Sequence, residues 1–451
     1  HLYVRFLHCA QAQGGERMTS NTIAVIILIC SFLLLMVCRL EIAYAMGIST
    51  ILTLVYLKIP LTVVYQGMVA GTNSFTFLAV PFFVFMGDLM SAGKVTDKIM
   101  ELAEALVGWM RGGLAMVNCV ASFLFGGISG SAIADVASLG PIECDLMKKG
   151  GYDSEFSWSL TMASSIQGML VPPSHNMVIY ACAAGAIGSV AIDSLLIAGV
   201  FPGAVLCVTM CLFSYVYAKR NGIPVSGKFS LTQLLRSFIT AFFPMLTVLI
   251  VVGGVVGGIM TATEASAFAV TYALVLVLFG LRTVRLKQVY AIASKTVKTL
   301  ASVMVLIAVS NSFGWLVAFL GIPKMVANAL LALTSSKYIL LLLSNLLLLF
   351  LGMFMSMGSI LLIVTPILLP VLMQVGVDPV HFGVLMIFVC GIGLLTPPVG
   401  GVLYVASGIS GIDIGRLSKK MLPFYAVMII ALLLVTYIPQ ISLWLPGVLI
   451  D

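Results

Sequence analysis

Long apolar runs with almost no charge inside them set the strongest limit on how this chain can fold. The stretches 23–37 and 338–351, for example, contain no charged residue. Charged residues make up only 9% of the 451 positions, against about 25% in an ordinary soluble domain, so too few are present to cover a water-soluble surface. Transmembrane β-strands alternate apolar and polar residues, whereas these runs are continuous. The sequence therefore predicts an all-α polytopic membrane protein.

The basic residues exclude a nucleic-acid binder and orient the predicted helices. The formal net charge is +7, but the 23 Lys and Arg lie in short loops between apolar runs and form no basic face. Two clusters, at 219–236 and 282–298, are separated by two predicted spans, which places both on the cytoplasmic side. The same rule places Met18 and the C-terminus outside.

Ten apolar runs are long enough to cross about 30 Å of hydrocarbon. They lie at 23–39, 42–58, 75–93, 155–188, 193–218, 243–260, 262–281, 299–320, 382–409 and 422–443. Two further apolar regions, 113–148 and 339–374, are too long for one span, and Gly and Ser interrupt each of them midway. We interpret each as a re-entrant hairpin of two half-length helices. Amphipathic arms are predicted before them, at 95–110 and 322–336.

The chain repeats itself at a fixed offset of 225 residues. Residues 121–182 and 346–407 align without gaps with 14 identities in 62 positions, and the excess over chance falls on Gly, Pro and Ser. Pro172-Pro173, for instance, corresponds to Pro397-Pro398. The predicted topology gives the two copies opposite orientations, so they form an inverted repeat. Such repeats are typical of transporters that alternate access around a site near the middle of the membrane.

Each predicted hairpin has a glycine- and serine-rich tip. The first reads Gly126-Gly-Ile-Ser-Gly-Ser131, and the second reads Gly352-Met-Phe-Met-Ser-Met-Gly-Ser359. Gly permits a sharp turn, and the turn leaves backbone groups without helical partners. At membrane depth such groups must face protein, water or ions. The positive end of the following helix suits an anion.

A broken span follows each hairpin. The breaks read Gly168-Met-Leu-Val-Pro-Pro-Ser-His-Asn176 and Gly393-Leu-Leu-Thr-Pro-Pro-Val-Gly-Gly401. A double Pro removes two backbone donors and frees carbonyl oxygens one turn earlier, and such oxygens suit Na⁺. A simple kink would explain one Pro-Pro pair, but two copies, each beside a Gly/Ser hairpin, favour binding sites.

These motifs give two Na⁺ sites and one anion site as predictions. The first Na⁺ site comprises Ser129, Gly130, Ser131, Val171, Pro172 and Pro173; the second comprises Ser356, Ser359, Thr396, Pro397 and Pro398. The anion is expected at Ser174, His175, Asn176, Gly400 and Gly401.

Three further side chains have competing interpretations. His175 either binds the substrate or is a buried histidine satisfied by a neighbouring helix, and no catalytic partner is positioned for it. Asp135, on the same helical face as Ser131, either helps to hold a cation or faces a water-filled vestibule. Glu264 is interpreted as part of a helix start, with Thr261 or Thr263 as the cap.

Taken together, the motifs resemble the large membrane subunit (M subunit) of tripartite ATP-independent periplasmic (TRAP) transporters, from Met18 onward. The resemblance rests on Ser129-Gly-Ser131, Lys148-Lys-Gly-Gly-Tyr-Asp153, Leu170-Val-Pro-Pro-Ser174, Ala198-Gly-Val-Phe-Pro-Gly203, Gly376-Val-Asp-Pro-Val-His-Phe-Gly383 and Gly393-Leu-Leu-Thr-Pro-Pro-Val-Gly400. The chain departs from the family in lacking an Asp near Ser356 and in reading Ala262 where Pro is common. His175-Asn176 occurs in only some members.

The resemblance implies an elevator-type, Na⁺-driven secondary transporter of the bacterial cytoplasmic (inner) membrane. It also implies a separate small four-helix membrane subunit and a soluble periplasmic binding protein that hands over an organic acid, such as a C4-dicarboxylate, a sialic acid or another sugar acid. The alternative is a stand-alone Na⁺/organic-anion symporter that needs no binding protein. An enzyme is not expected, because the spans offer almost no positioned acids, bases or metal ligands.

The expected division of the chain follows from these elements. Residues 1–17 are interpreted as an added or upstream remnant; 18–112 as N-terminal scaffold spans and the first arm; 113–188 as the first transport repeat; 189–338 as central scaffold spans and the second arm; 339–409 as the second transport repeat; and 410–451 as a C-terminal span.

Overall fold

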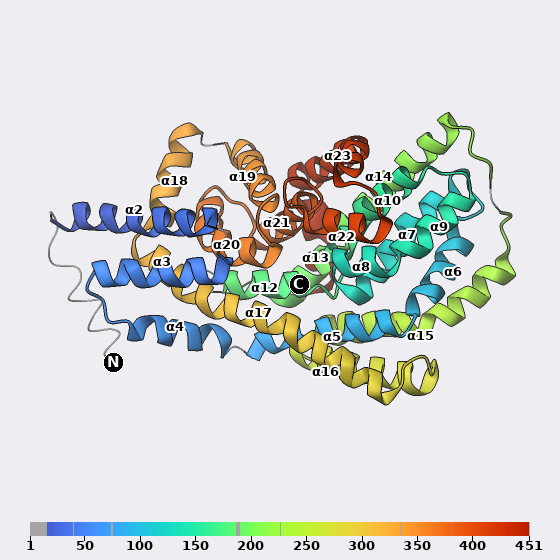
Figure 1. Cartoon of the computed structure of the whole chain (residues 1–451), viewed down its shortest axis with the longest axis horizontal. Helices are drawn as coiled ribbons and strands as arrows, with labels where there is room; N and C mark the ends of the chain where they lie inside the picture. Colours follow the sequence, from blue (N-terminus) through green and yellow to red (C-terminus); the bar gives the residue numbers. More distant parts are fainter. Residues whose placement is uncertain are drawn as a thin grey trace.

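The computed structural model describes residues 16–38, 40–73, 75–185, 190–225, 227–334 and 336–450, and every regular element in these ranges is a helix (Figure 1). Six helical segments are long and apolar enough to cross a membrane. They are Ile192–Arg220, Leu231–Val256, Ala262–Gly280, Leu286–Phe319, Met357–Gln374 and Ile414–Tyr437. The predicted all-α membrane fold is therefore confirmed. Most of the predicted remnant, residues 1–15, lies outside the described residues.

A first group of helices surrounds the long helix α17 (Leu286–Phe319). Helices α2 (Glu16–Val37) and α3 (Ile42–Tyr56) pack against each other, and α3 and α4 (Thr62–Thr72) both pack against α17. Helix α4 was not predicted. Its Gly67-x-x-x-Gly71 face lets the backbones approach closely, as is common between membrane helices: a Cβ built on Gly67 would lie only 2.6 Å from Ser312 Oγ.

The same group continues with α5 (Ala79–Ala92), which follows the short turn η1 (Phe75–Leu78), and with the arm helix α6 (Val95–Val107). Helices α15 (Leu231–Val256) and α16 (Ala262–Val275) pack together, and α16 ends in the π-turn η2 (Leu276–Gly280). Thr261 and Glu264 form a complete capping box at the start of α16, which confirms the predicted helix start. The second arm is α18 (Ile322–Leu333).

The two hairpins and the two broken spans are present at the predicted places. Hairpin 1 consists of α7 (Gly113–Ser129), α8 (Ala132–Ser138) and α9 (Gly140–Lys149); broken helix 1 consists of α10 (Ser154–Ser165), α11 (Gln167–Leu170) and α12 (His175–Ala184); hairpin 2 consists of α19 (Lys337–Gly352) and α20 (Met357–Gln374); broken helix 2 consists of α21 (Pro379–Gly393) and α22 (Gly401–Ser410). The returning arm of hairpin 1 is divided between two helices, whereas that of hairpin 2 is one helix.

Packing between these elements follows the repeat. Within each copy, the first arm of the hairpin packs against the first half of the broken helix: α7 against α10 and α11, and α19 against α21. Between the copies, the second half of each broken helix packs against the other hairpin: α12 against α20, and α22 against α8. In Figure 1, α7 and α19 lie on opposite sides of the centre, where α12 and α22 are found. The two copies are thus interlocked.

Further helices cover this interlocked pair of repeats. They are α13 (Ile192–Ala198), α14 (Val200–Arg220), α23 (Ile414–Tyr437) and α24 (Gln440–Leu449). Helix α14 packs against α7, and α23 packs against both α10 and α14. Two ion pairs join α23 to the start of broken helix 1: Lys420 Nζ lies 2.7 Å from Asp153 Oδ2, and Arg416 pairs with Glu155.

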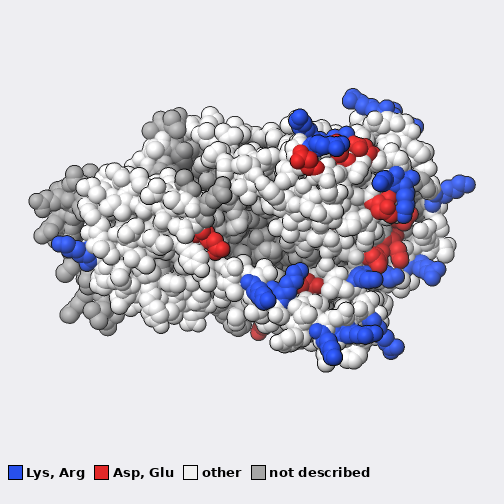
Figure 2. Space-filling model, in the orientation of Figure 1, with Lys and Arg blue, Asp and Glu red and all other residues white. Residues whose placement is uncertain are grey.

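Basic side chains gather toward one end of the molecule. Figure 2 shows most of the visible Lys and Arg at the right-hand side of the face drawn, with few at the left. Helix α14 ends in Lys219 and Arg220, and α17 begins just after Arg285. This distribution agrees with the predicted orientation, in which the basic loops share the cytoplasmic side.

Candidate functional site

The tip of hairpin 1 is a tight turn held by its own serines. Helix α7 ends at Ser129, Gly130 adopts a left-handed conformation (φ +62°), and Ser131 caps α8. The Ser131 hydroxyl accepts a hydrogen bond from Ala134 N at 3.4 Å, and Ser131 N donates to Ser129 Oγ at 3.4 Å. Gly is required at the turn because L-residues are strained at this φ. The two hydroxyl oxygens are thereby fixed at the tip.

The first helix break lies directly against this tip. A Cβ built on Gly130 would lie 2.7 Å from the carbonyl oxygen of Pro173, and one built on Gly127 would lie 3.3 Å from the carbonyl oxygen of Pro172. The structure thus brings Ser129, Gly130 and Ser131 together with the predicted segment 171–173. Serine hydroxyls and backbone carbonyl oxygens lie together here, and such oxygens suit a monovalent cation.

Three predicted substrate residues begin the second half of broken helix 1. Ser174 is fully buried, and its Oγ has no hydrogen-bond partner among the described residues. Asn176 is buried as well, and His175 is half-buried, with Nδ1 3.6 Å from a Cβ built on Gly130. A buried hydroxyl without a partner is costly unless a ligand or water pairs with it. The three residues therefore begin the helix that lies beside the tip of hairpin 1.

The second tip repeats the arrangement with a different sequence. Ser356 caps α20: its Oγ accepts from Ser359 N at 3.4 Å and lies 2.7 Å from Ser359 Oγ. Val399 N donates to Met353 O at 3.2 Å, so a backbone hydrogen bond ties the second break to its own hairpin. This bond involves neither Ser356 nor Ser359, so their grouping with Thr396, Pro397 and Pro398 stays a prediction.

The remaining predicted residues of this break are more open. Thr396 Oγ1 donates to Ile392 O at 2.9 Å, Pro397 is half-buried and Pro398 is exposed. Gly400 (φ +44°) precedes Gly401, the first residue of α22. No hydrogen bond found in the described part of the chain joins Gly400 or Gly401 to residues 174–176. Residues 174 and 175 lie beside Gly130 of the first tip, and α22, which begins at Gly401, packs against α8 of the same hairpin.

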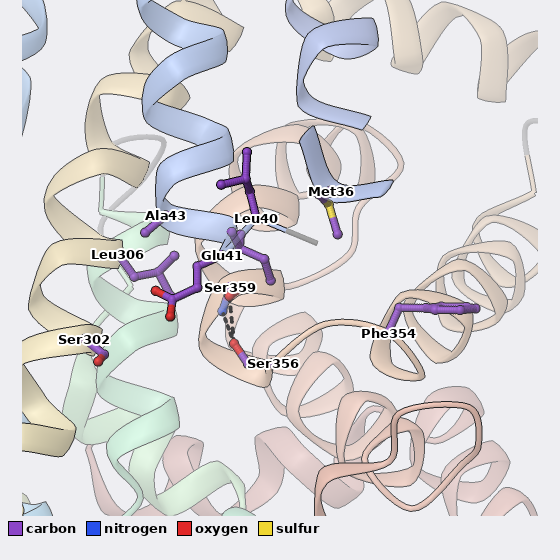
Figure 3. Close-up of a pocket in the computed structure, with 10 residues that line it drawn as sticks. Met36, Leu40, Glu41, Ala43, Ser302, Leu306, Phe354, Ser356 and Ser359 are labelled. Atoms are coloured by element: carbon purple, nitrogen blue, oxygen red, sulfur yellow. Dashed lines mark hydrogen bonds between the residues drawn. The ribbon is translucent and has the colours of Figure 1, made fainter. Parts of the chain in front are cut away.

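A cavity of about 370 Å³ opens beside the second tip (Figure 3). Its lining comprises Met36, Leu40, Glu41, Ile42, Ala43, Ser302, Leu306, Phe354, Ser356 and Ser359. Figure 3 shows Glu41, which precedes α3, close to Ser359. The cavity therefore lies between helices α2, α3 and α17 and hairpin 2, whose helix α20 also packs directly against α17. Glu41 was not predicted as a site residue, because it stands in a loop where sequence gives no facing element.

Pairs of glycines allow both hairpins to cross their broken helices at close range. A Cβ built on Gly126 would lie 2.4 Å from Gly168 Cα, and one built on Gly393 would lie 2.6 Å from Gly352 Cα. No side chain larger than hydrogen fits at these crossings without movement. The crossings hold each tip against its break, since they lie within one or two turns of both.

Of the buried polar network behind the first tip, the sequence predicted only Asp135. Ser122 Oγ donates to Asp135 Oδ1 at 3.2 Å and lies 3.1 Å from Ser164 Oγ, which donates to Asn118 Oδ1 at 2.8 Å. Asn118 Nδ2 in turn donates to Glu143 Oε2 at 2.7 Å. The signal was available: Asn118 and Ser122 are spaced four residues apart on an apolar helix.

Oxygen-rich hairpin tips that meet broken helices in an inverted repeat define a class, the secondary membrane transporters built from inverted repeats. Residues 29–441 match the family described as the tripartite ATP-independent periplasmic transporter, DctM component. The chain belongs to this family. It is the large permease subunit of a TRAP transporter, a multi-pass inner-membrane protein and not an enzyme.

Individual relatives agree with this assignment. The chain is 42% identical over 381 residues to the sialic acid TRAP transporter large permease protein SiaM of Vibrio cholerae, covering 84% of this chain and 88% of SiaM. It is 35% identical over 376 residues to the C4-dicarboxylate TRAP transporter large permease protein DctM of Pseudomonas aeruginosa, covering 83% and 87%. The YdaH transporter of Alcanivorax borkumensis shares the fold alone, with a TM-score of 0.59 and 15% identity over 85% of this chain and 89% of YdaH.

Proposed function

We propose that the chain imports a small organic anion driven by Na⁺, and that a periplasmic binding protein delivers this anion. Sialic acid and C4-dicarboxylates, named for the relatives SiaM and DctM, give the substrate class. A small four-helix membrane subunit on a separate chain would complete the complex. The observation that carries the proposal is the contact of each serine-capped tip with its own helix break.

Na⁺ would bind where each tip meets its break. At the first tip, the ligands would come from Ser129, Ser131 and the carbonyls of 171–173, because these are the oxygens that converge there. At the second tip they would come from Ser356, Ser359 and the segment 396–398. Binding would close the tip onto the break, since one ion takes ligands from both.

The anion would bind beside these cations, where Ser174, His175 and Asn176 supply hydrogen-bond donors. The unpartnered Ser174 Oγ supports this, because a ligand oxygen would satisfy it. Gly400 and Gly401 would contribute backbone N–H groups from the start of α22. Bound Na⁺ would attract the anion, so the two would be transported together.

The two repeats would move as one body past the helices around α17, in an elevator motion. Their interlocked packing supports a common motion, because α12 cannot leave α20 without breaking the contact between the copies. The packing of α14 and α23 on the repeats supports including both helices in the moving body.

The test is uptake by the assembled transporter in proteoliposomes. Candidate acids would first be screened for binding to the cognate periplasmic protein, and the bound acid would then be supplied with Na⁺ or K⁺ gradients of equal size. Uptake that requires both Na⁺ and the binding protein is expected. Uptake that is equal in K⁺ would overturn the coupling, and uptake by this chain alone would favour the stand-alone symporter.

A further inference from the structure

Two carboxylates of hairpin 1 are buried without any basic partner. Asp135 and Glu143 are at most 1% exposed, and none of the ion pairs found in the described part of the chain involves either of them. Each has one oxygen inside the polar network and one, Asp135 Oδ2 or Glu143 Oε1, that is buried with no hydrogen-bond partner. Buried carboxylates are strongly disfavoured unless a charge or further donors compensate them.

The second repeat shows that the fold does not need these polar groups. The offset of 225 residues is fixed in this region by the capping serines, Ser131 and Ser356. At that offset, Asp135, Glu143, Thr161 and Ser164 correspond to Ile360, Leu368, Met386 and Val389, all of which are buried. Ser122 corresponds to Leu347, which is exposed. Apolar side chains pack the same architecture in copy two, so the network serves a purpose particular to copy one.

The free oxygen of Asp135 faces the first tip across a glycine. A Cβ built on Gly168 would lie 3.8 Å from Asp135 Oδ2 and 3.9 Å from Ser129 Oγ, so both oxygens border the space that a side chain at 168 would fill. Ser129 is 5% exposed. The neighbouring Gln167 is fully buried, and neither of its amide atoms has a partner among the described residues. Asp135 Oδ2 is thus a buried, unsatisfied oxygen beside Gly168, and the next residue along the chain carries two more unsatisfied polar atoms.

We propose that Asp135 Oδ2 joins Ser129 Oγ, across Gly168, as a buried charged ligand of the Na⁺ at the first tip, and that this charged ligand exists in the first repeat only. The proposal rests on Na⁺-driven transport as proposed above and adds a charged ligand to it. Ser122 positions Asp135 by donating to its other oxygen, which leaves Oδ2 free for the ion. The site would be electrically neutral when filled. The second tip has no equivalent carboxylate, since Ile360 occupies that position, so the two repeats would bind Na⁺ with unequal affinity.

Asp135→Asn tests the site in the assembled membrane complex. Two quantities are measured: the rise in unfolding temperature on replacing KCl by NaCl at equal ionic strength, and the Na⁺ concentration that gives half-maximal uptake. In Asp135→Asn we expect the NaCl-specific stabilisation to fall by at least half and the half-maximal Na⁺ concentration to rise at least tenfold. Asp88→Asn is the matched control, because Asp88 is a partly buried carboxylate that accepts from Thr296 Oγ1 at 2.6 Å outside the repeats.

Gly168→Ala provides a second variant that leaves the carboxylate in place. Its methyl group would occupy the space between the two oxygens and would lie 3.3 Å from Gly126 Cα, a tight contact. It should weaken Na⁺ dependence as Asp135→Asn does, so the test stands even if one variant fails to fold. An unchanged Na⁺ response in folded Asp135→Asn would overturn the site. Wild-type uptake that is as fast at acid pH without Na⁺ as it is with Na⁺ would also overturn it, because a proton would then do the work assigned to the ion. Wild-type uptake without Na⁺ would instead refute the proposed function, while the thermal measurement would still test the site.

Discussion

Gly130 stands where the tip of the first hairpin meets a carbonyl oxygen of the first helix break, so Gly130→Ala tests whether that contact binds an ion. The residue has φ +62°, where a Cβ costs about 1–2 kcal/mol. The same Cβ would lie 2.7 Å from Pro173 O, which must withdraw by about 0.7 Å to reach ordinary contact at 3.4 Å. The substitution therefore strains the backbone and moves a proposed ligand.

The loss of one carbonyl ligand should have a measurable effect on Na⁺ affinity. Hydrogen bonds to charged groups contribute about 1.5–3 kcal/mol, and by that analogy the half-maximal Na⁺ concentration for uptake should rise roughly 10- to 150-fold. The assay is uptake by the assembled transporter as a function of Na⁺, with an unfolding temperature measured for each variant.

Gly151→Ala separates the two effects of this substitution. Gly151 also has a left-handed conformation (φ +87°), but a Cβ there meets no atom within 4 Å. It should lose about 1–2 kcal/mol of stability, as Gly130→Ala does, and keep its Na⁺ dependence. If the two variants lose uptake equally, or if Gly130→Ala stays within twofold of the wild type, the tip and the break do not form the ion site.

Three other predictions concern different contacts. Ser131→Ala should lose about 0.5–2 kcal/mol of stability, because it removes the cap of α8. It should also raise the half-maximal Na⁺ concentration for uptake. An unchanged dependence of uptake on Na⁺ would show that Ser131 is not a ligand. Gly71→Leu should lower the free energy of unfolding by about 1–3 kcal/mol, because its Cβ would lie 2.7 Å from the side chain of Asn311 in α17. Gly253→Leu is the control and should cause no such loss, because a Cβ at Gly253 meets nothing within 4 Å. Equal melting curves for the two variants would contradict this. Burial alone would raise the pKa of Asp153, but the hydrogen bond and charge of Lys420 outweigh it and hold that pKa below its ordinary value. Lys420→Met should therefore cost less than about 1 kcal/mol at pH 6, since both side chains are over a third exposed. The cost should be present in full above about pH 4, the ordinary pKa of Asp, and should disappear only as the pH falls through the lower pKa of Asp153 in the folded chain; a cost independent of pH would refute the pairing.

The membrane class, the hairpins and the broken spans could be predicted because their signals are local in sequence. Apolar length indicates spans, and Gly, Ser and Pro mark the tips and breaks wherever the backbone must depart from a helix. The offset of 225 residues then paired Ser131 with Ser356, and both serines do cap the returning helix. Thr261 and Glu264 were recognisable for the same reason, since a capping box involves only neighbouring residues.

Features that depend on distant contacts could not be predicted in this way. Helix α4 has only 11 residues, too few to cross a membrane, and its packing against α17 stabilises it. Helix α17 extends through Lys295, where charge suggested a loop; Lys295 and Thr296 instead contact Asp88 of α5. The buried network was missed because a sequence does not show which side of a hairpin helix faces another helix.

Helix α12 of the first copy packs on α20 of the second, and α22 of the second copy packs on α8 of the first. This reciprocal packing bears on how such a chain could have arisen. A polypeptide with one hairpin and one broken helix would leave half of that broken helix uncovered, and would cover it only by pairing with a second copy inserted in the opposite direction. The single chain therefore has the organisation of an antiparallel dimer whose subunits became joined by the α14–α15 connection. A symmetric dimer would have carried the same side chains in both halves. The apolar residues of copy two at the positions equivalent to the polar network of copy one therefore arose by divergence after the two halves were joined.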